Sequence, residues 1–258
     1  MSRTFLAVLQ YDGRDFVGWQ RQKSGRSVQG EFEQILTRLT GEQITAHASG
    51  RTDAGVHAVG MGVSFTAPDQ WTPADFHRAL NGLLPRDCWV QSVQRMQDGF
   101  HARKCAIGRR YRYDVGCDAE AWSPFRRPYE WPFGRPLDAD RLQRAAELLV
   151  GEHDFVAFAA KGTAQRHFRC VVEQAEWRTR SDGRGFSFHV AADRFLYRMV
   201  RMLVGTMIDI GSGRRAPEDM EHLLVSSDNS DTSPPAPPQG LYFLAADYPS
   251  RWYLEPSA

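Results

Sequence analysis

The chain has few cysteines and no long apolar run. Its four cysteines are spread over 258 residues without a Cys-x-x-Cys pair, so the usual spacing of zinc fingers and dithiol redox motifs is missing. The longest apolar stretch, residues 199–210, is interrupted by Arg201 and Asp209 and is too short to cross a bilayer. The N-terminus shows no apolar signal segment. We therefore expect a cytoplasmic protein that does not insert into a membrane.

Lysine is also scarce, and the net charge is small. The formal net charge is +1, and 29 of the 32 basic residues are arginine. The charges are segregated, because residues 101–127 contain seven basic and three acidic side chains, whereas residues 214–258 contain three and seven. Arginine suits bidentate phosphate contacts and stacking on bases, although a GC-rich genome also favours arginine over lysine. The charge pattern permits RNA binding without requiring it.

Residues 50–57, Gly-Arg-Thr-Asp-Ala-Gly-Val-His, form a stretch too small and polar for a core. Asp53 follows Arg51 by two positions, so in extended backbone both side chains project to the same side and the guanidinium favours the ionised carboxylate. An ionised oxygen on a loop is a candidate nucleophile or base. The same spacing also occurs in ordinary turns, in which Asp binds its own backbone and Gly takes a positive φ. Spacing alone leaves both interpretations open.

The residue identities of this loop resemble the signature loop of the tRNA pseudouridine synthase A family. Further family-like segments occur in the family's order between residues 5 and 248. They are residues 11–13, 18–22, 27–30, 98–103, 109–113, 195–201 and 240–242. By this resemblance the chain is identified as a member of that family.

The resemblance implies specific catalytic roles. It makes Asp53 the catalytic carboxylate, puts Arg201 beside it, and makes Tyr111 the aromatic that stacks on the target base and handles the proton at C5. Leu241 corresponds to an apolar residue near that base. Periodicity alone favours other interpretations: Arg201 as an arginine on a solvated helix face, Tyr111 as a half-buried strand residue and Leu241 as a core residue.

Further residues are candidates for substrate binding. Arg109 and Arg110 flank Tyr111, and an aromatic interleaved with arginines is a plausible base-stacking platform. We also expect Arg51 and His57 to contact substrate. No carboxylate or cysteine stands at ligand spacing from His57, so no metal site is expected.

The family resemblance implies a reaction and its partners. Uridine at positions 38, 39 and 40 of the tRNA anticodon stem-loop becomes pseudouridine: uracil leaves C1′ at N1, rotates and rejoins through C5. Because the reaction involves no redox change, no cofactor is expected. Asp53 either attacks C1′ or removes a ribose proton. The resemblance also implies a homodimer in which one tRNA spans both subunits.

The periodicity of the chain predicts an α+β fold. We expect two similar α/β halves forming a mainly antiparallel extended sheet flanked by helices, with a cleft between the halves. Residues 1–104 would carry the Asp53 loop, and residues 105–258 would carry Tyr111, Arg201 and Leu241. Strands are expected at residues 4–11, 59–65, 88–93, 107–117, 168–179, 185–191 and 241–248, and helices over residues 28–39, from 72 on, and over 138–150 and 195–210.

The composition also predicts an exposed loop. Residues 226–239 are polar and proline-rich, which favours an exposed, mobile segment.

Two other function classes stay open at this point. A non-catalytic RNA-binding module would need only Tyr111 and the arginines, with Asp53 as a turn residue. A glycoside- or nucleoside-hydrolysing enzyme would use paired carboxylates, but no second acid lies near Asp53 in the sequence.

Overall fold

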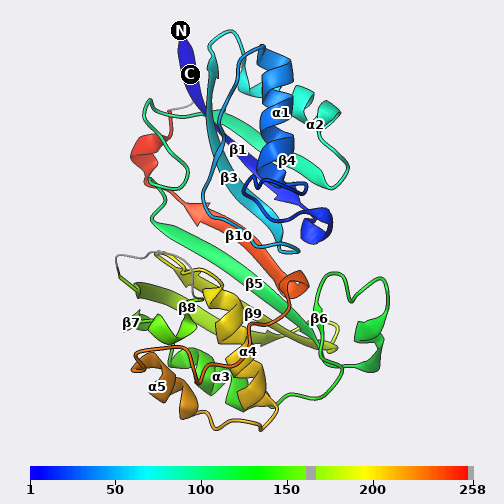
Figure 1. The fold of residues 1–258 in the computed structure, drawn as a ribbon, viewed down its shortest axis with the longest axis vertical. Helices are drawn as coiled ribbons and strands as arrows, with labels where there is room; N and C mark the ends of the chain where they lie inside the picture. The colour runs from blue at the N-terminus through cyan, green and yellow to red at the C-terminus, as the bar shows by residue number, and fades with distance from the viewer. Residues whose placement is uncertain (161–166, 255–258) are drawn as a thin grey trace. The chain divides into compact units, whose positions relative to one another are not determined.

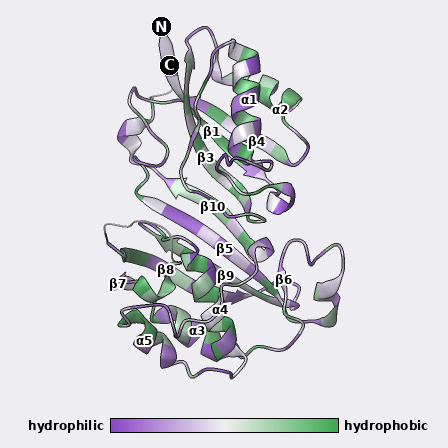
Figure 2. Ribbon diagram, viewed as in Figure 1, coloured by the Kyte–Doolittle hydropathy of each residue, from purple (hydrophilic) through white to green (hydrophobic). Residues whose placement is uncertain are grey.

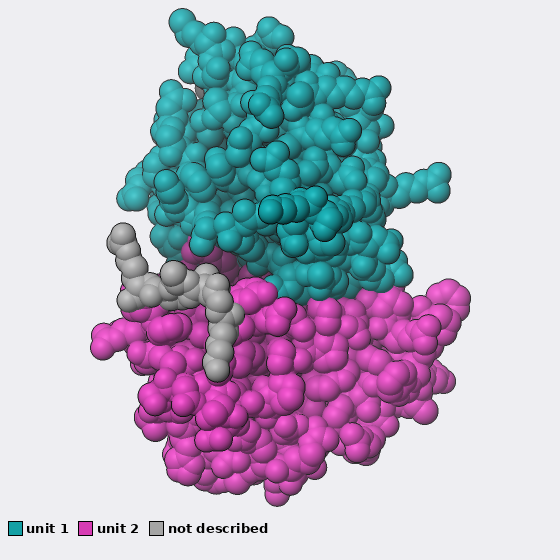
Figure 3. All heavy atoms as spheres, viewed as in Figure 1, with its two compact units in different colours: residues 1–108, 243–258 teal, residues 109–242 magenta. Residues whose placement is uncertain are grey.

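The computed structural model describes residues 1–160 and 167–254, and these form two compact units (Figure 3). Unit 1 comprises residues 1–108 and 243–254, and unit 2 comprises the described residues of 109–242. The C-terminal segment therefore belongs with the N-terminal residues, whereas the predicted halves, 1–104 and 105–258, grouped it with the second.

Unit 1 is built on an antiparallel sheet with the strand order β4-β1-β3-β10. β1 pairs antiparallel with both β3 and β4, so that Phe5 lies opposite Phe65 on one side and Arg95 on the other. The short β2 pairs antiparallel with β3. The bounds are β1 Ser2–Tyr11, β2 His47–Ala48, β3 His57–Pro68, β4 Cys88–Arg95 and β10 Leu241–Asp247.

Two capped helices cover one face of this sheet (Figure 1). α1 (Val28–Thr40) begins at Ser27, whose side chain accepts a hydrogen bond from the Gly30 N–H, and ends at Gly41 in the left-handed conformation. α2 (Pro73–Leu83) begins with a capping box. Both helices start where the sequence predicts.

An aromatic cluster joins the sheet of unit 1 to both helices. The ring of Phe5 from β1 lies 5.0 Å from that of Phe76 on α2, and the ring of Phe65 from β3 lies 5.8 Å from that of Phe32 on α1. All four side chains are buried. Because this apolar face is fixed, the loops at the sheet's ends are held by a rigid support.

The strands of unit 2 pair antiparallel in the order β5-β9-β8-β7. β6 pairs parallel with β5. β5 is largely hydrophilic in Figure 2, because arginines and an aspartate alternate there with buried tyrosines and a valine. The bounds are β5 Gly108–Gly116, β6 Trp131–Pro132, β7 Gly151–Asp154, β8 Arg169–Thr179 and β9 Gly185–Ala192.

The nearly all-apolar α4 of unit 2 packs against α3 and contacts β8. Trp177 on β8 donates its indole N–H to the Met207 sulfur of α4 at 3.3 Å, and its ring lies 5.1 Å from that of Phe188 on β9. The α-helices are α3 Ala139–Glu147, α4 Met199–Gly211 and α5 Asp219–Leu224. Short 3-10 helices lie at Gly13–Asp15, Ala119–Trp122, Val156–Phe158, Pro238–Gly240 and Ser250–Trp252. No helix in the described part of the chain is long and apolar enough to cross a membrane.

The predicted fold class is confirmed as α+β with mainly antiparallel strands flanked by helices. Two helix boundaries were wrong. α3 ends at Glu147 instead of residue 150. α4 begins at Met199 instead of residue 195, because Arg198 takes a left-handed φ of 60°. Residues 226–237 form a loop without helix or strand, as predicted, and about half of them are exposed, but the segment is anchored to the rest of unit 2. Backbone carbonyls of this segment accept hydrogen bonds from Arg201, Arg215 and Tyr113, and Ala236 is buried.

Candidate functional site

The Asp53 loop is clamped against residues 18 and 19. Asp53 forms an antiparallel backbone bridge with Gly18, and the Trp19 N–H donates to the Thr52 carbonyl at 3.1 Å. The Val56 N–H closes a turn by donating to the Asp53 carbonyl at 3.2 Å. Asp53 is half-buried. The backbone that carries the carboxylate is therefore fixed on both sides.

This close approach requires two glycines. A Cβ at Gly13 would stand 2.0 Å from the Val56 carbonyl oxygen, and a Cβ at Gly18 would stand 2.5 Å from the Thr52 carbonyl oxygen. Gly18 also has a φ of 108°, which side-chain-bearing residues rarely adopt. Glycine is therefore required in the family-like segments 11–13 and 18–22, because a side chain there would prevent the close contact with the Asp53 loop.

Two buried polar side chains hold the loop from inside. The hydroxyls of Tyr11 and Thr52 share a hydrogen bond of 2.7 Å. The Gly13 N–H donates to Nδ1 of His57 at 3.2 Å, which assigns the ring proton of a neutral His57 to Nε2. His57 is 2% exposed. Its predicted contact with substrate is therefore corrected to a role in holding the loop, since the ring does not face solvent.

Asp12 completes this support. Its Oδ1 lies 3.4 Å from Nδ1 of His57, and its carboxylate pairs with Arg14. Burial raises the pKa of Asp12, but the hydrogen bonds from Arg14 outweigh burial and the net pKa is lowered. Asp12 thus stays ionised at neutral pH.

Arg51 does not pair with the carboxylate two positions away. In the part of the chain that the structure describes, no hydrogen bond or ion pair involves Arg51, because the backbone turns at Asp53 instead of continuing as an extended strand. Burial lowers the pKa of Arg51, and the neighbouring Arg103 guanidinium lowers it further. The prediction that Arg51 lies against Asp53 was wrong; its charged neighbour is another cation.

Tyr111 is placed on β5 of unit 2. It is buried, stands opposite Val190 of β9, and its ring meets that of Phe195 edge-on at 4.9 Å. Arg109, on the same face of the strand, donates from its guanidinium to the Asp193 carbonyl at 2.9 Å. Arg110 points to the other face and is exposed. Of the two arginines, Arg110 is thus the more accessible to a ligand.

Arg201 lies in the first turn of α4 and is tied to the proline-rich segment. Its Nε donates to the Ala236 carbonyl at 2.7 Å, and the Ala236 N–H donates back to the Arg201 carbonyl at 2.8 Å. These two hydrogen bonds immobilise the Arg201 side chain up to Nε. Arg201 is therefore held in place and is not an arginine on a solvated helix face.

Leu241 is buried at the start of β10, next to a close backbone approach. The fully buried Tyr113 donates its hydroxyl to the Pro237 carbonyl at 2.7 Å, and burial raises its pKa well above the ordinary value. A Cβ at Gly240 would stand 2.7 Å from the Tyr113 ring. Tyr113 and Gly240 thus fix the position of Leu241 at the start of β10.

The structure groups the predicted residues by unit. Asp53, Arg51 and His57 belong to unit 1, and the remaining ones, Tyr111, Arg109, Arg110, Arg201 and Leu241, belong to unit 2. Sequence reasoning missed the residues that hold the loop, although their family-like segments were a usable signal. Within residues 1–160 and 167–254, no group of three or more His, Cys, Asp or Glu side chains is arranged to hold a metal ion.

Comparison with known proteins shows the family of this chain. A family model described as tRNA pseudouridine synthase matches residues 7–103 and 145–249. The chain belongs to this family. It is an isomerase family that acts on tRNA, so the predicted family and enzyme class are confirmed.

Curated relatives match over nearly their whole length. The tRNA pseudouridine synthase A of Moorella thermoacetica is 41% identical over 93% of this chain and 98% of its own, and that of Geobacillus kaustophilus is 39% identical over 96% and 95%. A solved structure of the archaeal box H/ACA sRNP Nop10-Cbf5 complex covers 80% of this chain and 43% of its own, with a TM-score of 0.35 and 14% identity, a likeness too weak to bear on the site.

Proposed function

We propose that this protein converts uridine to pseudouridine at positions 38, 39 and 40 of the tRNA anticodon stem-loop, with Asp53 as nucleophile or base. The observation that supports the proposal most directly is the Asp53 loop, whose backbone is clamped by Gly18, Trp19 and Val56 while the carboxylate stays half-exposed. A preorganised anionic oxygen of this kind is what the reaction requires at the ribose.

The reaction is an isomerisation, so its atoms balance within the substrate. The bond between C1′ and N1 breaks, the uracil rotates, and a bond forms between C1′ and C5. The C5 proton leaves and N1 ends protonated. Asp53 either attacks C1′, giving a covalent sugar intermediate, or removes a ribose proton.

Two residues of unit 2 keep the roles that the family resemblance implies. Tyr111 would stack on the detached base and handle the C5 proton, and its fixed ring, held edge-on by Phe195, suits a stacking surface. Arg201 would supply the cation that favours the ionised carboxylate. Its stem is already immobilised by Ala236, so little side-chain entropy is lost when it acts.

The target uridine must leave its stack before it can react, as other base-modifying enzymes require. Exposed arginines such as Arg110 would contact phosphates and 2′-hydroxyls, which predicts tRNA binding that weakens steeply with salt. We further propose a homodimer and a cytoplasmic location. The free cysteines of the described chain agree with a reducing compartment.

The test is to incubate the protein with unmodified tRNA, without added metal or nucleotide, and to map pseudouridine at nucleotide resolution. We expect conversion at positions 38 to 40 with no change in RNA mass. Release of free uracil would instead indicate a hydrolase. Binding without conversion of any tRNA would indicate an RNA-binding module, and either result would refute the proposal.

A further inference from the structure

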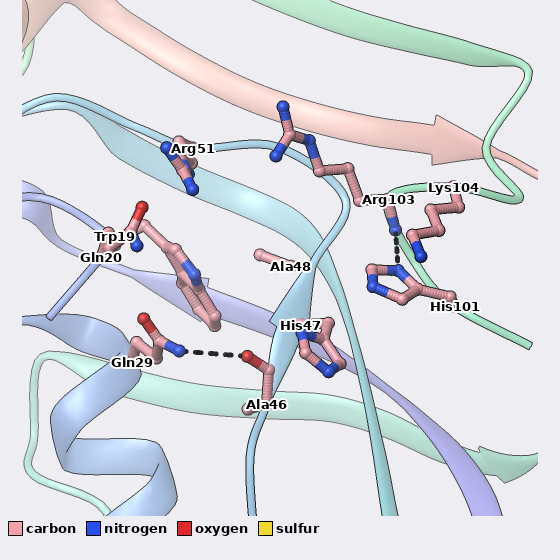
Figure 4. Close-up of a pocket in the computed structure, with 10 residues that line it drawn as sticks. All are labelled: Trp19, Gln20, Gln29, Ala46, His47, Ala48, Arg51, His101, Arg103 and Lys104. Atoms are coloured by element: carbon pink, nitrogen blue, oxygen red, sulfur yellow. Dashed lines mark hydrogen bonds between the residues drawn. The ribbon is translucent and has the colours of Figure 1, made fainter.

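Unit 1 contains a pocket of about 380 Å³ beside the Asp53 loop. It is lined by residues from the 18–22 segment, α1, β2 and the 101–104 segment, and by Arg51. Figure 4 shows His101, Arg103 and Lys104 on one side and Trp19 and Gln29 on the other. The volume lies within the range of about 300–1,000 Å³ that is usual for small-ligand sites.

The pocket is strongly cationic. Arg51, Arg103 and Lys104 line it, and none of the described lining residues carries a carboxylate. Within the described chain, Arg51 and Lys104 form neither a hydrogen bond nor an ion pair. Like charges that lie close together repel each other, and an anion that binds among them reduces this repulsion.

A stacked pair of histidine rings lies beside the cations. The rings of His47 on β2 and His101 lie 4.4 Å apart with an interplanar angle of 21°. The Arg103 N–H donates to Nδ1 of His101 at 3.2 Å, so the neutral ring carries its proton on Nε2 and remains a donor. Burial lowers the pKa of His101, and the neighbouring His47, Lys104 and Arg103 lower it further.

The opposite wall is fixed by a buried carboxylate. Glu33 on α1 accepts hydrogen bonds from the Gln29 amide at 2.9 Å and from the Ala46 N–H at 2.8 Å. The Gln29 amide also donates to the Ala46 carbonyl at 3.2 Å, as Figure 4 shows. The pocket is therefore preformed, which reduces the entropic cost of binding a ligand.

We propose that this pocket binds a backbone phosphate of the bound tRNA, with Arg51, Lys104 and His101 as the main donors. The inference rests on the proposed function, because tRNA is the polyanion that this family acts on. Arg51 belongs both to the pocket and to the catalytic loop, two residues before Asp53. Seating the phosphate thus fixes the RNA backbone relative to the loop that carries the carboxylate.

The histidine gives the site a pH dependence with a defined sign. In the free protein His101 is neutral at pH 7, because its pKa is lowered by burial and by the groups that face it, which are His47 from β2 and Lys104 and Arg103 from its own segment. A bound phosphate favours the charged ring and raises that pKa. Binding therefore takes up a proton, and affinity rises as the pH falls through the pKa of the bound state.

The first test compares two lysine variants. Lys104→Gln removes a pocket cation, and Lys23→Gln removes an exposed lysine of the same unit that does not line the pocket. We expect Lys104→Gln to weaken tRNA binding about tenfold and to reduce the slope of log affinity against log salt by about 0.7–1. Lys23→Gln should leave both unchanged. Equal affinities and slopes for the two variants would overturn the proposal.

The second test follows the histidine. The imidazole signals of His101 are recorded by NMR against pH with unmodified tRNA and with inorganic phosphate. We expect tRNA to raise its pKa and His101→Gln to flatten the pH dependence of tRNA affinity, whereas the exposed His222→Gln keeps it. A pKa that responds to inorganic phosphate but not to tRNA would assign the pocket to a free anion and contradict the proposal.

Pseudouridine formation in the same samples separates the two proposals. If the wild-type protein converts tRNA while Lys104→Gln binds like Lys23→Gln, only the phosphate site is refuted. If the wild-type protein binds tRNA through the pocket without any conversion, the proposed function fails and the phosphate site stands.

Discussion

The substitution Gly13→Ala tests whether the short helix at residues 13–15 positions the Asp53 loop. The added Cβ would stand 2.0 Å from the Val56 carbonyl oxygen and 2.9 Å from its nitrogen, whereas ordinary contacts begin at 3.4 Å. Both neighbours are backbone atoms, so no side chain can rotate away. Either this helix or the loop of Asp53 must move by more than an ångström.

The size of the effect follows from this displacement. Overpacking of this kind lowers the free energy of unfolding by about 1–3 kcal/mol, or about 2–4 °C in Tm for each kcal/mol. A misplacement of about 1 Å at a reacting group costs roughly a hundredfold in rate. We therefore expect Gly13→Ala to fold with a lower Tm and to form pseudouridine about a hundred times more slowly, while tRNA affinity changes little.

A matched glycine-to-alanine control, at a position with open space, is expected to stabilise the protein. A Cβ at Gly82, in the last turn of α2, meets nothing within 4 Å. Gly82→Ala should raise the free energy of unfolding by about 0.5–1 kcal/mol and leave the rate unchanged. Single-turnover rates and thermal unfolding are measured for both variants. A wild-type rate and Tm for Gly13→Ala would refute the idea that this contact holds the loop.

Three further predictions concern stability and thiol chemistry. Glu33→Ala leaves the buried Ala46 N–H without its acceptor and should lower the free energy of unfolding by about 1–3 kcal/mol in denaturant titrations. Glu33→Gln keeps an acceptor oxygen and should lower it by less than about 1 kcal/mol. Equal losses for the two variants would contradict this explanation. Arg198→Asn should raise Tm by about 1–3 °C, because asparagine tolerates the φ of 60°, and a lower Tm would argue against strain there. Burial raises the pKa of Cys88 and Cys170 to about 12, so both thiols stay protonated at pH 8 and should resist alkylation in the native protein; rapid labelling followed by mass spectrometry would show the opposite.

Local signals in the sequence were sufficient for most elements. Ser27 and Thr72 predicted the starts of α1 and α2, because caps act within one turn. The alternation of β5 predicted its buried face, since Tyr111 and Tyr113 are buried. These features depend on neighbours in sequence, which is why they could be predicted.

Features that depend on distant residues were not accessible in this way. Polar, proline-rich composition correctly predicted an exposed loop at 226–239, but it could not show that Arg201 and Tyr113 bind carbonyls of this loop from far along the chain. Spacing predicted a pair between Arg51 and Asp53, but the turn is set by contacts with residues 18 and 19. The catalytic roles themselves came from family resemblance, because periodicity does not separate a catalytic arginine from a surface one.

The central claim is that the carboxylate of residue 53 performs the chemistry, and Asp53→Asn tests it most directly. The amide has nearly the same shape as the carboxylate but is neither a base nor a nucleophile. We predict that this variant binds tRNA with wild-type affinity and loses pseudouridine formation by several orders of magnitude in a single-turnover assay. Turnover within a few-fold of the wild-type rate would contradict the account.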